Sequence, residues 1–520
     1  MKLKEAIETQ VLLGDGANGT YLGILGYESA SFDFAVLENP DLVRQCHRAY
    51  LEAGSDFIET NSFQANALRP GHDLIDIYQL NCKAAEIAKS IAGEYENRYV
   101  LGAIGPSGKL IEPIGDLTGE ELFAAIQHQA EGLRDGGVDG FILETFADLL
   151  ELEIAVNAVK SVSDLPVIIS KAFIEDGEAL AEGLPLRAGA QMAQMGAHAI
   201  GANCIVGPQR MLDLIRQLGE SCTLPIVALP TPGLPQYVNR VITYDAKPDY
   251  FAKAVARLVE EGASVIGGCC GTTPDHIAAI RSLIPFGQKR PAPKKVRRQE
   301  LAEKKPLVQA QPSELSAKIQ TNKFLISVEL DVPRGLNIDR LLAGARKLKI
   351  AGVDVVDISD GARARLRMNP TAVSHLIQSD VGLETVMHFA CRDRNILAIQ
   401  SDLLGAHALG IRNILAITGD PANIGDYPSA TSVFDVGSVG LVSILQGFNE
   451  GRDRAGNSIG MRCSFTIAVA YNPTAQDQKK ENDRLQMKVD QGANLIYTQP
   501  IFSAKDADNA IEMASKVNNK

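Results

Sequence analysis

Tryptophan is absent from the 520-residue sequence, and aromatic residues make up only 5% of it. Proteins that hold single-stranded nucleic acid usually stack its bases on aromatic side chains, and this composition offers no obvious platform for that. The formal net charge of -12 also argues against broad binding to nucleic acid or to an anionic membrane surface. We therefore expect no nucleic-acid partner.

Long apolar runs are missing as well, since no stretch approaches the roughly 20 apolar residues of a membrane-spanning helix. The N-terminus, MKLKEAIETQVLLGDG, lacks the apolar run and small-residue cleavage site of an export signal. Eight cysteines are too few to staple a chain of this length, so we expect reduced thiols. These features predict a cytoplasmic protein with no membrane partner, and they leave a homo-oligomeric state open.

What the chain does contain is typical of a globular protein, with 45% hydrophobic and 22% charged residues. A single core rarely grows this large, so we expect at least two domains.

The first domain is predicted to be a (β/α)8 barrel of the TIM type over residues 1–285. Short apolar runs alternate there with helix-like stretches, and eight such units in about 280 residues match a barrel in number and length. The predicted strands are Val11–Leu13, Phe57–Ile58, Tyr99–Ile104, Gly140–Leu143, Pro166–Ile169, Ala197–Ile200, Pro225–Ala228 and Ser264–Ile266.

Residues 286–320 are predicted to be a linker, because apolar periodicity disappears and Pro, Gln and Lys dominate. A second α/β series occupies residues 321–520, with strands reading FLISVEL, VDVVDIS, LETVMHF, IRNILAIT, CSFTIAVA and ANLIYTQ. We count about six strand–helix units where a barrel needs eight, so we expect a second TIM-type barrel that is truncated and incomplete at its C-terminus.

Cysteines mark the predicted catalytic face of the first barrel, where residues directly follow the strands. Cys204 follows the sixth strand, and Cys269 and Cys270 follow the eighth between glycines. Three thiolates suit tetrahedral Zn²⁺ and leave one open position, which is the pattern of a catalytic site. A thiol substrate in that position would lose its proton and become a nucleophile. The alternative is that these are inert core cysteines, which we prefer for Cys46, Cys82, Cys222, Cys391 and Cys463.

The segment Gly14–Gly19 also fits the G-x-G-x-x-G pattern of dinucleotide-binding folds. A single match is weak, and the continuing alternation of eight strands favours the barrel.

The motifs GDGANGT, ETNSFQAN, ILETF, GANCIVGP and IGGCCGTTPDHI resemble the homocysteine S-methyltransferase family over the first half. The resemblance implies that Cys204, Cys269 and Cys270 bind zinc. It also implies that Asp15 and Gly16 help to hold the amino-acid end of homocysteine, and that Glu144 binds its ammonium group, a role that suits a carboxylate. Where relatives often carry an Asn-Ala-Gly-Leu-Pro-like segment, this chain has TPGLP from Thr231, which leaves the methyl donor open.

The second half contains the segments ISVEL, VVDISDGA, MHFACRDRN, GIRNILAITGDP and LIYTQPIF, which resemble methylenetetrahydrofolate reductase. The resemblance implies bound FAD, with NAD(P)H as the hydride source and tetrahydrofolate derivatives as substrates. Glu329 would be the general acid, Asp420 would lie near flavin and folate, and Gln499 would hydrogen-bond the pterin. The residues implied to contact FAD are Ser359, His388, Thr418, Gly419 and Asp420.

Together these features predict a bifunctional enzyme that methylates homocysteine to methionine and reduces 5,10-methylenetetrahydrofolate to 5-methyltetrahydrofolate. Two alternatives remain. The zinc could be structural in a scaffold-like first half, and the shortened second half could bind flavin or folate without turnover. S-methylmethionine, S-adenosylmethionine, methyltetrahydrofolate and a corrinoid all remain candidate methyl donors.

Overall fold

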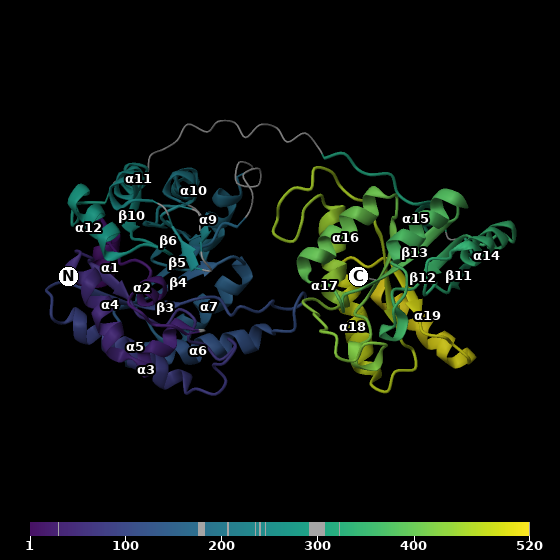
Figure 1. Ribbon diagram of the computed structural model, residues 1–520, viewed down its shortest axis with the longest axis horizontal. Coiled ribbons are helices and arrows are strands. Elements are labelled where there is room, and N and C mark those ends of the chain that lie inside the picture. Colours follow the sequence, from purple (N-terminus) through teal and green to yellow (C-terminus); the bar gives the residue numbers. More distant parts are fainter. Residues whose placement is uncertain are drawn as a thin grey trace. The chain divides into compact units, whose positions relative to one another are not determined.

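The structure is a computed structural model, and it describes residues 1–29, 31–174, 183–204, 207–233, 236–238, 241–244, 246–290, 307–321 and 323–518. Its contacts divide the chain into two compact units, Met1–Lys109 with Leu117–Lys304 and Leu110–Asp116 with Lys305–Lys520. Each unit contains parallel strands covered by helices, as Figure 1 shows.

The first unit is built around an eight-stranded parallel sheet in the order β1-β10-β7-β6-β5-β4-β3-β2. Its strands are β1 (Leu12–Leu13), β2 (Phe57–Glu59), β3 (Tyr99–Ile104), β4 (Gly140–Phe146), β5 (Val167–Lys171), β6 (Ala199–Asn203), β7 (Ile226–Leu229) and β10 (Ala263–Ile266). The backbone N–H of Asp56 donates to the carbonyl of Leu13 at 2.6 Å, so the two ends of the sheet nearly meet. The predicted barrel and its eight strands are confirmed.

Helices follow most strands of this unit, and local sequence explains where several begin. The Thr118 hydroxyl and the Glu121 carboxylate form a reciprocal capping box at the start of α6. The helices are α1 (Leu3–Thr9), α2 (Asn18–Ile24), α3 (Ala35–Glu38), α4 (Pro40–Glu52), α5 (Ile77–Ala92), α6 (Gly119–Asp135), α7 (Leu149–Val162), α9 (Leu184–Gln194), α10 (Pro208–Ser221), α11 (Pro248–Glu260) and α12 (Pro274–Leu283). A hairpin of β8 (Gln236–Val238) and β9 (Val241–Thr243) was not predicted.

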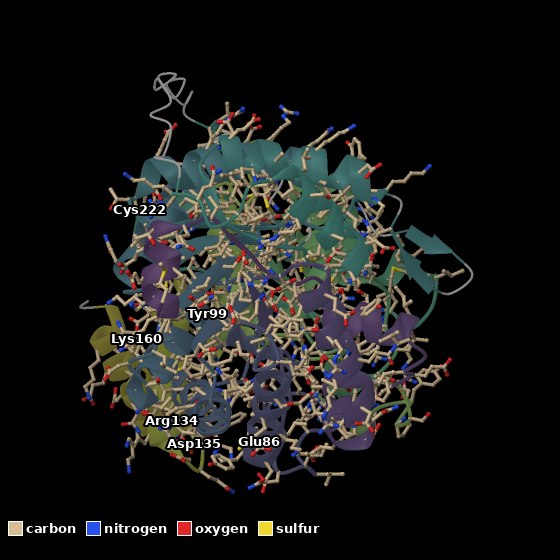
Figure 2. The ribbon with its side chains drawn as sticks, turned by 90° about the vertical axis from the view of Figure 1, so that its left-hand side faces the viewer. Glu86, Tyr99, Arg134, Asp135, Lys160 and Cys222 are labelled. Atoms are coloured by element: carbon tan, nitrogen blue, oxygen red, sulfur yellow. The ribbon has the colours of Figure 1, made fainter. Side chains whose placement is uncertain are left out.

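Helix α1 fills one end of the barrel interior. Its residues Leu3, Ala6 and Ile7 are buried in one apolar cluster with side chains from all eight barrel strands. At the start of β3, the Tyr99 hydroxyl donates to the carbonyl of Met1 at 3.0 Å. Tyr99 is labelled in Figure 2. The α1 end is therefore closed by packing, which leaves the opposite end, where the strands finish, for a site.

The second unit contains a six-stranded parallel sheet in sequence order. Its strands are β11 (Ser327–Leu330), β12 (Val355–Ile358), β13 (Glu384–Ala390), β14 (Asn413–Ile417), β15 (Thr466–Tyr471) and β16 (Leu495–Thr498). Its helices are α13 (Glu314–Gln320), α14 (Asp339–Ile350), α15 (Pro370–Asp380), α16 (Ile396–Ala408), α17 (Ser438–Asn449), α18 (Gln478–Asp490) and α19 (Ala504–Asn518). The sheet curls into part of a barrel, and the prediction of a second barrel with six rather than eight strands is confirmed.

The range predicted as a linker contains helix α13. Residues 291–306 of that range lie outside the described residues. In α13, Leu315 is buried beside Val355, Val386 and Leu415 of the second sheet, as α1 is buried in the first. The linker prediction therefore ran too far toward the C-terminus, because a seven-residue helix carries too little periodicity to stand out.

Among the helices in the described part of the chain, none combines the length and the apolar character that a bilayer crossing requires.

Replacing Ile7 with alanine tests the packing role of α1. Ile7 is fully buried, so the Ile7→Ala change removes apolar contacts and leaves a cavity, which should lower the unfolding free energy of the first unit by about 2–5 kcal/mol. Urea unfolding followed by circular dichroism measures the shift. Ile24→Ala is the control, because Ile24 is 67% exposed. Equal shifts for both variants would contradict the packing role.

Candidate active site at the mouth of the first barrel

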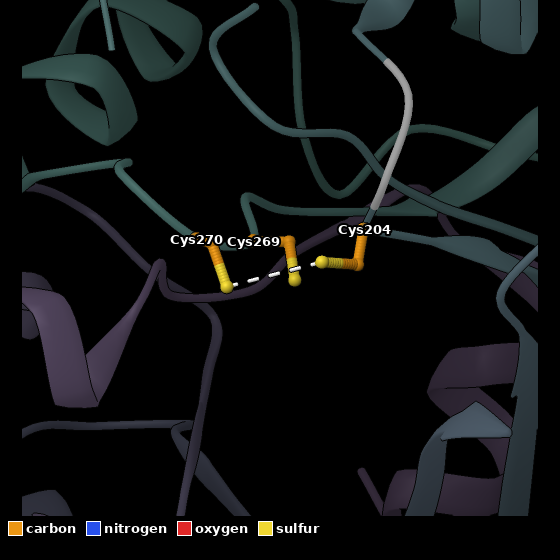
Figure 3. Close-up of side chains that lie close together, drawn as sticks. All are labelled: Cys204, Cys269 and Cys270. Carbon is orange, nitrogen blue, oxygen red and sulfur yellow. Dashed lines mark hydrogen bonds between the residues drawn. The ribbon is translucent and has the colours of Figure 1, made fainter. Parts of the chain in front are cut away.

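Three cysteine sulfur atoms converge where β6 and β10 end, as Figure 3 shows. The sulfur atoms of Cys204, Cys269 and Cys270 all lie within 4.8 Å of one another. Those of Cys204 and Cys270 are 3.8 Å apart. A tetrahedral zinc ion with Zn–S bonds of about 2.3 Å would hold its sulfur ligands about 3.8 Å from each other. The spacing of this thiol cluster therefore fits one such ion.

Backbone hydrogen bonds fix the two segments that carry the thiols. The backbone N–H of Cys204 donates to the carbonyl oxygen of Leu229, and that of Cys269 donates to the carbonyl oxygen of Pro230, each at 3.0 Å. Cys204 has a φ of 56°, a conformation that non-glycine residues seldom adopt. The adjacent barrel strands therefore hold the sulfur-bearing turns in place before any ligand arrives.

Crowding disfavours the ionised thiols when no cation is bound. Hydrogen bonds from Cys204 and Cys270, together with burial, raise the pKa of the Cys269 thiol well above its ordinary value. The hydrogen bond with Cys204 is the largest of the causes that raise the pKa of Cys270 to about 12. A divalent cation would supply the charge that three neighbouring thiolates need, so the donor set is suited to a metal.

Three carboxyl groups, the buried Asp15 and the partly buried Glu59 and Glu144, lie at or just after the ends of β1, β2 and β4. The Asp15 carboxylate accepts the N–H of Glu59 at 3.0 Å. Burial raises the pKa of Asp15 and Glu59, and for Glu59 the charge of Glu144 adds to the effect. Burial also raises the pKa of Glu144 to about 7. Such a group of acids would be stabilised in the ionised form by a cationic ligand.

A cavity of about 300 Å³ joins the thiols to these acids. Its lining includes Cys204, Cys269, Cys270, Glu59, Glu144 and Gly16, with Phe32 and Phe63 as apolar wall. A ligand in this cavity could reach the sulfur cluster with one end and the carboxyl groups with the other. Asp15 lies behind the lining and is only 3% exposed.

Gly16 is required by the close approach of neighbouring side chains. A Cβ atom at this position would lie 2.6 Å from the Thr272 hydroxyl oxygen and 3.0 Å from the Tyr50 ring. The turn after β1 therefore passes tightly beside the turn after β10. This approach brings residues 17–20 into the cavity wall, and the G-x-G-x-x-G pattern forms the turn after the first barrel strand.

The cysteines outside the cluster differ in burial. Cys46, Cys391 and Cys463 are buried, as expected for core cysteines, whereas Cys82 and Cys222 are partly exposed on helices or their ends. Figure 2 labels Cys222 near the surface of the first unit.

In the second unit the predicted general acid lies beside a buried polar group. Glu329 is exposed, yet partial desolvation and the charges of Asp357 and Asp331 raise the pKa of its carboxyl group. His388 on β13 is 3.9 Å from the Asp357 carboxylate, and burial lowers its pKa to about 4. Asp357 also accepts a hydrogen bond from Ser327. The first strands of the second sheet thus bring an acid, a neutral imidazole and a buried carboxyl group together.

The other predicted residues of this unit lie at the ends of their strands. Ser359 is buried after β12, and the Thr418 hydroxyl accepts the N–H of Ser438 at 3.1 Å. Asp420 and Gln499 are both exposed. The Asp420 carboxylate accepts the backbone N–H of Arg363 at 2.8 Å, and the backbone N–H of Gln499 donates to the carbonyl of Tyr471.

A cavity of about 310 Å³ opens next to these strand ends. None of the predicted residues lines it, although Asp360, which directly follows Ser359, does, along with Arg365, Arg392 and Arg394. Gly419 has a φ of 89°, and a Cβ there would lie 3.0 Å from that of Ala390, so this turn requires glycine.

Sequence reasoning did not assign a role to two residues of the first site. Glu59 lines the cavity, and Asn203 is buried next to Cys204. Both occupy the end of a barrel strand, and that position is the signal that could have identified them.

Comparison with known families also divides the chain into two parts. The homocysteine S-methyltransferase family model matches residues 12–284, and the methylenetetrahydrofolate reductase family model matches residues 314–520. The methionine synthases of Mycobacterium leprae (strain TN) and Mycobacterium tuberculosis (strain ATCC 25618 / H37Rv) are 34% and 33% identical over 303 residues. Each alignment covers 54% of this chain and 25% of the relative, so the match spans about a quarter of the length of these relatives.

The structures similar to this chain include the homocysteine methyltransferase MmuM from Escherichia coli in its metallated form. The two are 24% identical with a TM-score of 0.45, over 52% of this chain and 96% of that one. Its apo form is 25% identical with a TM-score of 0.41, over 52% and 95% of the two chains.

The first family model covers more than half of the sequence, and the second covers most of the remaining residues. The chain therefore belongs to the homocysteine S-methyltransferase family of enzymes, and carries in addition a unit of the methylenetetrahydrofolate reductase type.

Proposed function

We propose that residues 1–285 catalyse zinc-dependent methyl transfer to homocysteine, giving methionine. We further propose that residues 321–520 carry out FAD-dependent reduction of 5,10-methylenetetrahydrofolate to 5-methyltetrahydrofolate, with NAD(P)H as the reductant. The observation that carries the first activity is the convergence of three thiols on a cavity that is also lined by the carboxyl groups of Glu59 and Glu144.

Each end of homocysteine has a partner in this cavity. Glu144 is the acceptor for the substrate ammonium group, because an ionised carboxylate forms a strong charge-assisted hydrogen bond. Asp15 and Gly16 shape the same end from the turn after β1, and Asp15 holds the backbone of Glu59. The apolar wall of Phe32 and Phe63 suits the methylene carbons between the two ends.

Cys204, Cys269 and Cys270 are the proposed zinc ligands. Zinc bound to them would supply the positive charge that converts the homocysteine thiol into a thiolate near neutral pH. Three protein ligands leave one position for substrate, which distinguishes a catalytic site from a closed structural one. Adding homocysteine to the cobalt-substituted protein and recording the ligand field separates the two roles. An unchanged spectrum would favour the structural role.

The methyl donor is a separate question. The TPGLP segment starts at Thr231, and Leu234 and Pro235 lie outside the described residues. Incubating the protein and homocysteine with S-methylmethionine, S-adenosylmethionine or methyltetrahydrofolate in turn, and quantifying methionine, identifies the donor. A requirement for a corrinoid protein would appear as no product with any of the three.

In the second unit, Ser359, His388, Thr418, Gly419 and Asp420 are the proposed FAD contacts. The support for this assignment is positional, since all five residues lie in or just after β12, β13 and β14 of the second sheet. FAD would supply hydride transfer from NAD(P)H to the folate. Glu329 would protonate the leaving folate nitrogen, Asp420 would lie near flavin and folate, and Gln499 would hydrogen-bond the pterin.

Cys270→Ser tests the metal site. Loss of one thiolate should weaken zinc binding and abolish methyl transfer together, since the remaining two thiols form an incomplete set. Zinc retained after dialysis against a chelator, and methionine formed per minute, are the measurements. Cys82→Ser is the matched control, because Cys82 is a partly exposed helix cysteine. Full zinc content with full activity in Cys270→Ser would rule out this site.

Glu144→Gln tests the ammonium contact. Removing the negative charge should raise the KM for homocysteine by about 10–100-fold while zinc content stays unchanged, because a charge-assisted bond contributes about 1.5–3 kcal/mol. Steady-state kinetics with metal analysis measures both. Glu153→Gln removes a charge from the exposed face of α7 and serves as the control. An unaltered KM in Glu144→Gln would exclude the contact.

Glu329→Gln tests the acid of the second unit. The variant should still bind FAD and show its visible absorption. Its rate of folate reduction should fall by about 10²–10⁴-fold, which is the usual contribution of a general acid to a reaction rate. Because the pKa of Glu329 is raised above its ordinary value of 4.5, reduction in the wild type should fall with rising pH at a pH above that value. Asp331→Asn controls for loss of a nearby charge. A colourless wild-type protein that takes up no FAD would instead support a second unit without turnover.

A further inference from the structure

The end of β4 has an irregular backbone that local sequence does not favour. The pairing of β4 with β5 shifts register between Leu143 and Phe146. Within this bulge Thr145 has a φ of 67°, a left-handed conformation that is costly for a β-branched residue. The bulge directs the adjacent Glu144 into the cavity. Contacts from elsewhere in the barrel must therefore stabilise it.

The Asn203 side chain supplies those contacts from β6. Its amide oxygen accepts the backbone N–H of Thr145 at 2.9 Å and the Ser170 hydroxyl at 2.8 Å. Its amide nitrogen donates to the Thr145 hydroxyl at 2.6 Å. Asn203 is only 1% exposed, so these hydrogen bonds form away from solvent, where losing them is costly.

The same amide nitrogen also reaches both ends of the cavity. It lies 3.2 Å from the Glu144 carboxylate and 3.8 Å from the Cys269 sulfur. A primary amide has two hydrogens, and one of them is directed to the Thr145 hydroxyl. The other hydrogen is left for the carboxylate and the sulfur, which both lie within reach of the nitrogen. In this way one side chain contacts the bulge, Glu144 and the thiol cluster.

We propose that Asn203 is a positioning residue that sets the separation between the ammonium-binding carboxylate of Glu144 and the metal-binding sulfur of Cys269. This inference rests on the proposed methyltransferase function. A fixed separation selects an amino-acid thiol by the length of its side chain. Homocysteine then reaches both ends of the cavity, and cysteine, which is one methylene shorter, does not. Partners that orient metal ligands in this way typically contribute 10–100-fold to metal affinity.

Asn203→Ser tests the proposal, with Asn81→Ser as the matched control. Asn81 is also a fully buried amide of the first unit, and it donates to Ala65 and Ile77 rather than to the site. We expect Asn203→Ser to lower zinc affinity by about 10–100-fold in chelator competition. We also expect it to alter the sulfur-to-metal charge-transfer bands of the cobalt-substituted protein, and to reduce the kcat/KM ratio of homocysteine over cysteine by about tenfold. Asn81→Ser should lose stability without these changes.

Wild-type measurements separate this inference from the function on which it rests. A wild-type protein that binds neither zinc nor homocysteine would overturn the proposed function itself. A competent wild type, with zinc affinity and thiol discrimination in Asn203→Ser equal to those of Asn81→Ser, would overturn only the role of Asn203.

Ser170→Ala decides the matter if Asn203→Ser does not fold. This change removes the hydroxyl that holds the Asn203 amide oxygen and leaves the amide in place. It should shift zinc affinity and thiol discrimination in the same direction by a smaller factor, about threefold, the effect of one neutral hydrogen bond. Unchanged values of both would contradict the positioning role.

Discussion

Parallel strands that close into a barrel deliver the residues after each strand to one end, and the candidate site depends on that convergence. Cys204 and Cys270 are 66 positions apart in the sequence, yet their sulfur atoms lie 3.8 Å apart. Because α1 fills the interior at the other end, the barrel interior offers space for a ligand where the strands finish. Ionised thiols repel one another, and hydrogen bonds from the backbone of Cys204 and Cys269 to Leu229 and Pro230 keep these three close together.

The sequence predicted the strands well, because each is a short apolar run bounded by turn residues. Strand ends then located Cys204, Cys269 and Cys270 with no knowledge of their contacts. Helix α1 was not predicted to fill the barrel interior, since an amphipathic stretch of seven residues does not reveal what its apolar face will cover. Helix α13 was taken for linker for the same reason, although its Leu315 is buried against the second sheet.

The geometry within the first site could not be predicted from local sequence. Thr145 favours an extended conformation, and nothing near it in sequence predicts a left-handed one. The hydrogen bonds that stabilise it come from Asn203 on β6, and Ser170 on β5 supports Asn203. Long-range polar contacts of this kind override local preference, and strained residues held by them are common where side chains must be aimed at a ligand. The strand-end position of Glu59 marks it as a candidate, but its interaction with Glu144 across the cavity is determined by the fold.

On the proposed functions, the two units place different demands on carboxyl groups whose pKa is raised. In the first unit, Glu144 in its proposed role must be ionised to bind an ammonium group, and the arriving positive charge would offset the burial that raises its pKa. In the second, Glu329 in its proposed role must keep its proton to act as an acid, and partial burial together with the charge of Asp357 raises its pKa in that direction. On the proposed functions, one unit makes a methyl group whose leaving group is an amine, and the other makes a thiolate. A thiolate alone does not displace an amine readily. Direct transfer from the folate would therefore need a proton on the folate nitrogen, and otherwise the methyl group would have to pass through a carrier.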